Sequence, residues 1–156
     1  HVVAAIRDYR LLGALLTAAE AAGSAARCLA VIVDYLKTRK QFGKLIGSYQ
    51  ALKHPTVDIY CGVEDTRSFC YHAASLLDAD SLSHDAEIAC RMAKVSAGQT
   101  MSYAGDRAVQ FHGGIGFTWE CYVHLFFKRQ MHNQVLYGDA KYQRALLADL
   151  IIGKAA

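Results

Sequence analysis

The chain contains one proline, Pro55, among 156 residues. Proline is the main breaker of helices, because it lacks a backbone N–H and clashes with the preceding turn. Long, uninterrupted helices are therefore possible along almost the whole sequence. Hydrophobic residues make up 53% of the chain and charged residues 20%, which excludes a disordered chain and suits one domain with a real core.

The clearest helical pattern covers residues 9–38. Its polar residues recur at intervals of three, four and seven, which places them on one narrow stripe of a helix. Two apolar lines cover the rest of the surface: Tyr9, Leu12, Leu16, Ala19 and onward, and Leu11, Leu15, Ala18, Ala22 and onward. This arrangement predicts a helix that is buried on most of its sides.

Further helices are predicted near residues 52–77, 84–111, 119–131 and 139–152, with loops at 39–49 and 78–83. Pro55 fits the first turn of its helix, and Ser83 and Asp139 are candidate N-caps. No segment alternates convincingly as a strand does. The predicted fold class is all-α, an antiparallel up-and-down helical bundle.

Composition narrows the choice of partners and compartment. The net charge is only +3, which argues against nucleic acid. The apolar stretch from Leu11 to Ala19 is shorter than the about 20 residues of a membrane span. Five cysteines form no CxxC pair, so we expect reduced thiols in the cytoplasm.

Metal chemistry has no support in the sequence. The seven histidines lack zinc-ligand spacing, and no Glu or Asp precedes a histidine by three residues, as a di-iron bundle requires. The glycines at 113–116 follow a predicted helix and not a strand, so they are not a dinucleotide fingerprint of the Rossmann type.

Two short motifs have ordinary structural explanations when each is taken alone. In the R-x-x-F-G motif at 39–43, Arg39 can cap the end of the first helix. In Q-x-x-G-G at 110–114, the glycines can end the third helix. Together, in this order and spacing, the segments RKQFGKLIGSYQALKH (39–54), QFHGGIGFTWE (110–120), HLFFKR (124–129) and LYGD (136–139) resemble the C-terminal helical domain of the acyl-CoA dehydrogenases. The resemblance covers about residues 9–152.

The resemblance implies a flavin enzyme that binds FAD and removes two hydrogens from an acyl-CoA thioester. A carboxylate takes the α-proton, hydride goes to the flavin, and electrons pass to an electron-transfer flavoprotein. It also implies a homo- or hetero-oligomer, and an N-terminal helical domain and a middle β domain that this chain lacks. The start at His1, without an initiator Met, led us to expect a fragment or a processed product.

The resemblance assigns FAD-binding roles to individual residues. Arg39 is expected at the pyrophosphate of FAD in a neighbouring subunit, where an arginine fork forms strong charged hydrogen bonds. Gln41 and Phe42 are expected beside the dinucleotide. The adenosine side is expected to be lined by Ile46, Tyr49 and Leu52, and the dinucleotide to be contacted by Gln110, Gly113 and Gly114.

The catalytic turn departs from the family pattern. Where the family has Tyr-Glu-Gly-Thr, with Glu as the base, the resemblance puts Gly138 at the base and Ala140 at the Thr. Some members carry the base on the first helix, but residues 12–14 hold no carboxylate. Asp139 is a weak candidate base and a better N-cap.

Three functions follow as alternatives. The chain is part of an active dehydrogenase that uses Asp139 or a base outside these residues. Alternatively, it belongs to a non-catalytic subunit whose partner supplies the Glu. The third possibility is a helical interaction domain that binds no cofactor.

Overall fold

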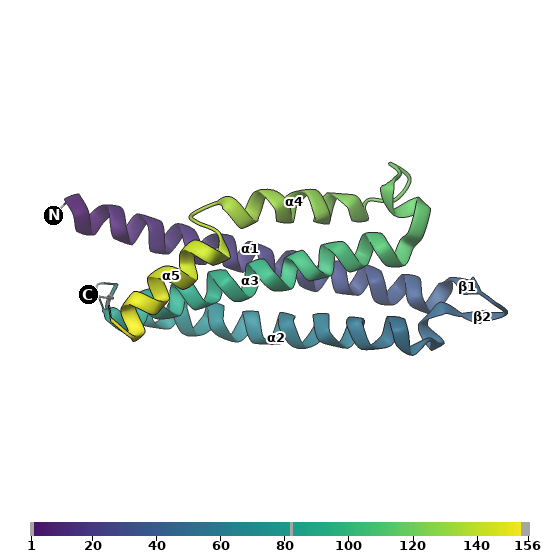
Figure 1. Ribbon diagram of the computed structural model, residues 1–156, viewed down its shortest axis with the longest axis horizontal. Helices are drawn as coiled ribbons and strands as arrows, with labels where there is room; N and C mark the ends of the chain where they lie inside the picture. Colours follow the sequence, from purple (N-terminus) through teal and green to yellow (C-terminus); the bar gives the residue numbers. More distant parts are fainter. Residues whose placement is uncertain (1, 82, 154–156) are drawn as a thin grey trace.

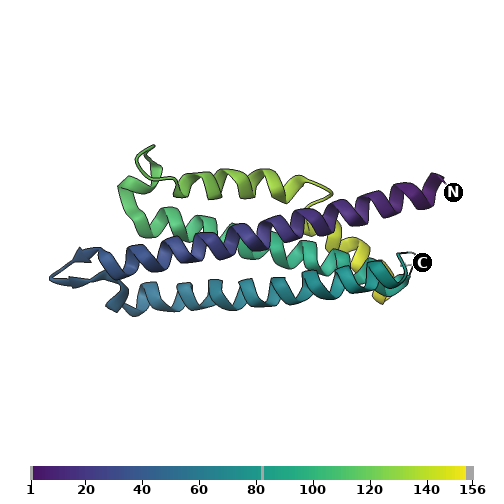
Figure 2. The same ribbon diagram turned by 180° about the vertical axis from the view of Figure 1, so that it is seen from behind.

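The computed structural model describes residues 2–81 and 83–153. The elements in this part of the chain are α1 (Val2–Thr38), β1 (Lys40–Gln41), β2 (Lys44–Leu45), η1 (Ile46–Ser48), α2 (Gln50–Ala79), α3 (His84–His112), η2 (Gly113–Phe117), α4 (Val123–Val135) and α5 (Ala140–Ile151). The long helices α1, α2 and α3 run side by side, and α4 and α5 pack along α3 (Figures 1 and 2). The all-α bundle is confirmed.

The helix ends follow local chemistry. Ser83 and Asp139 are N-caps as predicted, since their side chains accept hydrogen bonds from the backbone N–H of Ala86 and Tyr142. Leu82, within the predicted 78–83 loop, lies outside the described residues. Pro55 is in the second turn of α2, because this helix begins at Gln50, earlier than predicted.

Two further helix boundaries were predicted wrongly. The first helix begins at Val2, well before residue 9. The start of the fourth helix shifts from 119 to Val123, because residues 118–122 form turns, with the N–H of Cys121 bonded to the Thr118 carbonyl.

The predicted 39–49 loop is a small β-hairpin followed by a 3₁₀ turn. Lys40 pairs with Leu45 and Gln41 with Lys44, in antiparallel register. The two residues between the strands, Phe42 and Gly43, have positive φ angles of 53° and 80°. Positive φ at both central positions is typical of the tight turns that suit the twist of a hairpin.

The core contains the second apolar line of α1 but not the whole of the first. Side chains of the second line, from Leu11 and Leu15 to Ile32 and Leu36, are at most 7% exposed, except that of Leu29, which is partly buried. In the first line Tyr9, Leu12 and Leu16 are more than half exposed within this chain, so the prediction that α1 is buried on most sides fails for its N-terminal half.

The expectation that no segment is long and apolar enough to span a membrane is not confirmed for α1. An 18-residue window of this helix has a mean hydropathy of 1.4, enough by length and composition to cross a membrane. Core helices of soluble proteins pass the same test, and 39% of the window is buried inside the bundle.

Candidate functional site

The two motifs of the sequence lie at the same end of the bundle. The β1–β2 hairpin and the C-terminal end of α3 both lie at the right-hand end of Figure 1. An aromatic stack joins them, since the rings of Tyr35 and His112 are 4.0 Å apart and nearly parallel. His112 is buried, which lowers the pKa of its imidazole, and its Nδ1 lies 2.7 Å from the Ala108 carbonyl. This stack packs the end of α3 against α1 one helical turn before Arg39, so both motifs lie at this end of the bundle.

The hairpin presents basic and aromatic side chains to solvent. Within the described part of the chain, the guanidinium of Arg39 has no hydrogen-bond or ion-pair partner. Phe42 is 89% exposed, and the ammonium of Lys44 lies 4.3 Å from the ring centroid of Tyr49. The remaining predicted contacts differ in burial: Gln41, Gln110, Gly113 and Gly114 are exposed, Tyr49 and Leu52 are half-buried, and Ile46 is buried.

The glycines after α3 serve different purposes. A Cβ at Gly113 or Gly114 would meet no atom within 4 Å, so open space lies beside them. A Cβ at Gly116 would instead lie 2.7 Å from the Val109 carbonyl oxygen. Packing explains Gly116, whereas packing does not explain Gly114.

The turn between α4 and α5 lies close to α1. Tyr137 and Gly138 have φ angles of 57° and 96°, and the Asp139 carboxylate accepts the N–H of Tyr142 at 2.8 Å. A Cβ at Gly138 would lie 2.3 Å from Cδ1 of Tyr142. The backbone of this turn therefore requires glycine at 138, for both conformation and space.

The ring of Tyr137 covers the one glycine of α1 that faces it. A Cβ at Gly13 would lie 2.2 Å from the ring of Tyr137. The hydroxyl of Tyr137 is 3.4 Å from that of Tyr9, and this hydrogen bond raises the pKa of Tyr137. Tyr137 is thus a neutral phenol at pH 7 and not a proton acceptor.

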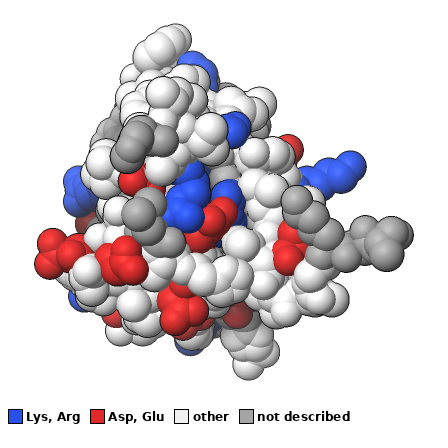
Figure 3. All heavy atoms as spheres, turned by 90° about the vertical axis from the view of Figure 1, so that its left-hand side faces the viewer, with Lys and Arg blue, Asp and Glu red and all other residues white. Residues whose placement is uncertain are grey.

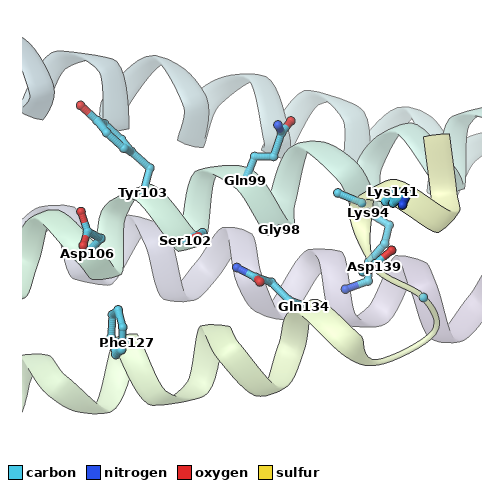
Figure 4. Close-up of a pocket in the computed structure, with 12 residues that line it drawn as sticks. Lys94, Gly98, Gln99, Ser102, Tyr103, Asp106, Phe127, Gln134, Asp139 and Lys141 are labelled. Carbon is cyan, nitrogen blue, oxygen red and sulfur yellow. The ribbon is translucent and has the colours of Figure 1, made fainter.

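The turn separates two cavities. A hollow of about 200 Å³ at the end of the bundle, in the view of Figure 3, is lined by Tyr137 together with arginines of α1 and α3. A groove of about 600 Å³ on the other side is lined by Gly138, Asp139 and Ala140, with Lys94, Asp106 and Phe127 among the residues facing it (Figure 4). Tyr137 and Asp139 therefore border different spaces.

Comparison with known proteins indicates the same family as the sequence motifs. The family described as "Acyl-CoA dehydrogenase, C-terminal domain" matches residues 11–152. The chain belongs to the acyl-CoA dehydrogenase family. Acyl-CoA dehydrogenase IpdE2 of Mycolicibacterium smegmatis is 40% identical over 130 residues, which cover 83% of this chain and 39% of that protein.

Solved structures agree with this assignment to the family. The glutaryl-coenzyme A dehydrogenase–glutaryl-CoA complex superposes with a TM-score of 0.88 at 26% identity, over 96% of this chain and 38% of that one. The ChsE4–ChsE5 complex from Mycobacterium tuberculosis gives a TM-score of 0.86 at 26% identity, over 94% and 39%. The chain thus spans about two fifths of the length of its relatives.

Sequence reasoning missed three features of this acyl-CoA dehydrogenase domain. They are the Tyr35–His112 stack, the contact of Tyr137 with Gly13, and the arginines around the end cavity. The stack had a partial signal, because Tyr35 lies one helical turn before Arg39 and His112 lies inside the Q-x-x-G-G motif. The other two depend on how α1, α3 and α5 pack, and no local pattern announces them.

Proposed function

We propose that this chain is the C-terminal domain of an FAD-dependent acyl-CoA dehydrogenase, and that its hairpin end binds the dinucleotide. The observation that carries the proposal is that the hairpin and the C-terminal end of α3 lie at the same end of the bundle, with Arg39, Phe42 and Gln110 all exposed. When bound, FAD would accept the hydride from the acyl group. The remaining parts of the proposal are an acyl-CoA substrate, an electron-transfer flavoprotein as electron acceptor, an oligomer and a cytoplasmic location.

The residues present fit the chemistry of FAD. The pyrophosphate carries negative charge, and Arg39 offers a guanidinium free to donate two parallel hydrogen bonds. Gly113 and Gly114 leave room for a ligand to approach the backbone. A nearby cavity lined by Tyr35 and His112 is also lined by Asp34 and Glu120, so the negatively charged pyrophosphate suits the basic hairpin better than this cavity.

Loss of FAD on removing Arg39 tests the proposal. Arg39→Ala in the full-length protein should weaken FAD binding by about 10- to 150-fold, the value of a charged hydrogen bond. The measurement is the absorbance ratio of flavin to protein after gel filtration, with a titration of added FAD. Arg67→Ala is the matched control, because Arg67 is exposed on α2 and pairs only with Glu64 at the surface. Equal flavin retention in both variants would refute the assignment.

We further propose a different register for the catalytic turn. In Tyr-Glu-Gly-Thr, a glycine is followed by a residue able to cap a helix. Here the positive-φ glycine is Gly138 and the helix cap is Asp139. Matching these two features sets Tyr137, and not Gly138, at the position of the Glu. It also places Asp139 at the position of the Thr. Asp139 then serves as the N-cap of α5, which weakens it as a candidate base.

This register supports a second candidate function, a non-catalytic subunit in a heteromer. The phenol of Tyr137 fills the space above Gly13, where a carboxylate on either element would lie. A partner subunit would then supply the base that takes the α-proton. Loss of a general base costs about 10²–10⁴ in rate.

Two carboxylate variants separate the registers. Tyr137→Glu keeps Gly138 and should give measurable turnover of acyl-CoA with an artificial electron acceptor. Gly138→Glu should destabilise the turn, because its side chain would collide with Tyr142. Turnover in wild-type homomer that disappears in Asp139→Asn would instead favour Asp139 as the base.

A further inference from the structure

Three arginines surround the cavity at the end of the bundle beside the turn. The cavity of about 200 Å³ is lined by Arg7, Arg10 and Arg91, with Tyr137 and Gln143 on the side of the turn. Figure 3 looks onto this end, where basic and acidic side chains lie together within a hollow. Sites for drug-sized ligands measure about 300–1,000 Å³. This smaller cavity suits the end of a chain and not a whole ligand.

The carboxylates nearby neutralise two of the arginines but not the third. Glu87 accepts hydrogen bonds from Arg91 at 2.5 and 3.0 Å and lies 3.7 Å from Arg7. Asp8 lies 3.6 Å from Arg7. Within residues 2–81 and 83–153, Arg10 has no acidic partner, and its guanidinium sits 5.9 Å from the ring centroid of Tyr142. The cavity therefore has one positive charge in excess.

A buried amide connects this cavity to the turn. Gln143 is 1% exposed; its Oε1 accepts from Arg91 at 2.8 Å, and its Nε2 donates to the Tyr137 carbonyl at 2.6 Å. Both hydrogen bonds are short and fix the cavity wall relative to Tyr137. An acyl group that reacts beside Tyr137 would have the arginines within reach of its far end.

We propose that this cavity binds a carboxylate at the far end of the acyl group. The substrate class would be acyl-CoA thioesters whose acyl chain ends in a carboxylate. Arg10 would contact the carboxylate through its guanidinium fork, while Arg7 and Arg91 offset the charges of Glu87 and Asp8 and leave the charge of Arg10 in excess. Val3, Ile6, Leu11 and Ala14 supply apolar walls for methylene groups. This inference rests on the proposed acyl-CoA dehydrogenase function.

The positive charge of Arg10 also disfavours acyl groups that end in a methyl group. A methyl-ended acyl chain in this cavity would take water from Arg10 without providing an acceptor, and desolvating an unpaired charge is costly. Specificity then has two sources, attraction for the carboxylate and a penalty for its absence.

Binding of two thioesters of equal chain length tests the inference. Adipyl-CoA and hexanoyl-CoA differ only in the terminal carboxylate, and isothermal titration with the flavin-loaded full-length protein gives Kd without turnover. Wild type should bind adipyl-CoA at least about tenfold more tightly. Arg10→Gln should weaken adipyl-CoA by about 10- to 150-fold, and hexanoyl-CoA by less than about threefold. Arg10→Lys, which keeps the charge but loses the fork, should fall between.

A second arginine of α1 serves as the control, because it lies far from the cavity. Arg27→Gln removes the same charge from α1 about 25 Å along the helix and should change neither Kd. Equal wild-type affinity for both thioesters, or equal losses in Arg10→Gln, would overturn the inference and leave the proposed function standing. Failure of wild type to bind either thioester would count against the proposed function itself. Because Arg10 is exposed and makes no ion pair with the residues that the structure describes, its variants should keep the wild-type melting temperature.

Discussion

The two ends of the bundle use glycine and polar groups in opposite ways. At the hairpin end, Arg39 and Gln110 are exposed, and Gly114 has open space where a Cβ would lie. At the turn end, Gln143 is buried with both of its amide atoms bonded, and Gly138 has a neighbour at 2.3 Å from its missing Cβ. At the hairpin end these groups face open space, whereas at the turn Gln143 and Gly138 are held by neighbouring atoms. Variants at matched residue types should separate the two.

The largest effect on stability is expected at Gly138. Gly138→Ala forces a positive φ on a residue with a Cβ and places that Cβ against Tyr142. The free energy of unfolding should therefore fall by about 2–4 kcal/mol. Thermal and urea unfolding measure the change. Gly23→Ala is the control: Gly23 lies in α1 with nothing within 4 Å, and alanine there should stabilise by about 0.5–1 kcal/mol. Similar changes in the free energy of unfolding for Gly138→Ala and Gly23→Ala would show that the turn does not require glycine at 138.

A pH-dependent effect is expected from Lys94, which borders the groove beside the turn. Lys94 is 3% exposed, its Nζ donates to the Asn133 carbonyl at 2.6 Å, and burial lowers its pKa from 10.5 to about 8. Between these values the unfolded chain binds more protons than the folded one, so the free energy of unfolding rises with pH. The rise attributable to Lys94 should be about 1–3 kcal/mol.

The contribution of Lys94 is isolated by comparison with Lys94→Met. Urea unfolding of both proteins at pH 7.5, 9 and 10.5 removes the effects of other groups, including Cys28 and Cys90, whose pKa values burial raises to about 12 and 11. The wild type should gain stability relative to the variant across this range. Parallel curves would mean that Lys94 titrates normally.

A smaller effect is expected at Asp139. Asp139→Ala removes the acceptor for the Tyr142 N–H and should cost about 0.5–2 kcal/mol, whereas Asp139→Asn keeps an N-cap and should cost less than about 0.5 kcal/mol. The two melting temperatures give the comparison. An asparagine variant as unstable as the alanine variant would show that the negative charge, and not the cap, is what stabilises the turn.

The smallest effect on folding is expected at Gly114. Gly114→Ala meets no neighbouring atom, so the free energy of unfolding should change by less than about 0.5 kcal/mol. FAD retention by the full-length protein should nevertheless fall, if the backbone there approaches the ligand as we propose. An unchanged flavin content would mean that FAD does not approach the backbone at Gly114. The hairpin end would then differ less from the turn end than we propose.

Sequence reasoning located most of the fold because helix signals are local. The spacing of polar residues, the caps at Ser83 and Asp139, and the glycines after His112 each act within a few residues. The exposure of Tyr9 and Leu16 could not be predicted, because an apolar line on a helix does not tell which chain covers it. The R-x-x-F-G and Q-x-x-G-G motifs are short patterns that could be found in the sequence, whereas Arg10, Arg91 and Tyr137 meet at the end cavity only through packing.

The unbroken length of α1 also constrains how this domain can change. The helix touches the turn at Gly13 and the end of α3 at Tyr35, about 33 Å apart along its axis at 1.5 Å per residue. Inserting one residue between them would rotate one contact against the other by about 100°, so both could not be kept. The connecting loops can change in length without disturbing either contact, whereas the interval between Gly13 and Tyr35 must keep its length for both contacts to form.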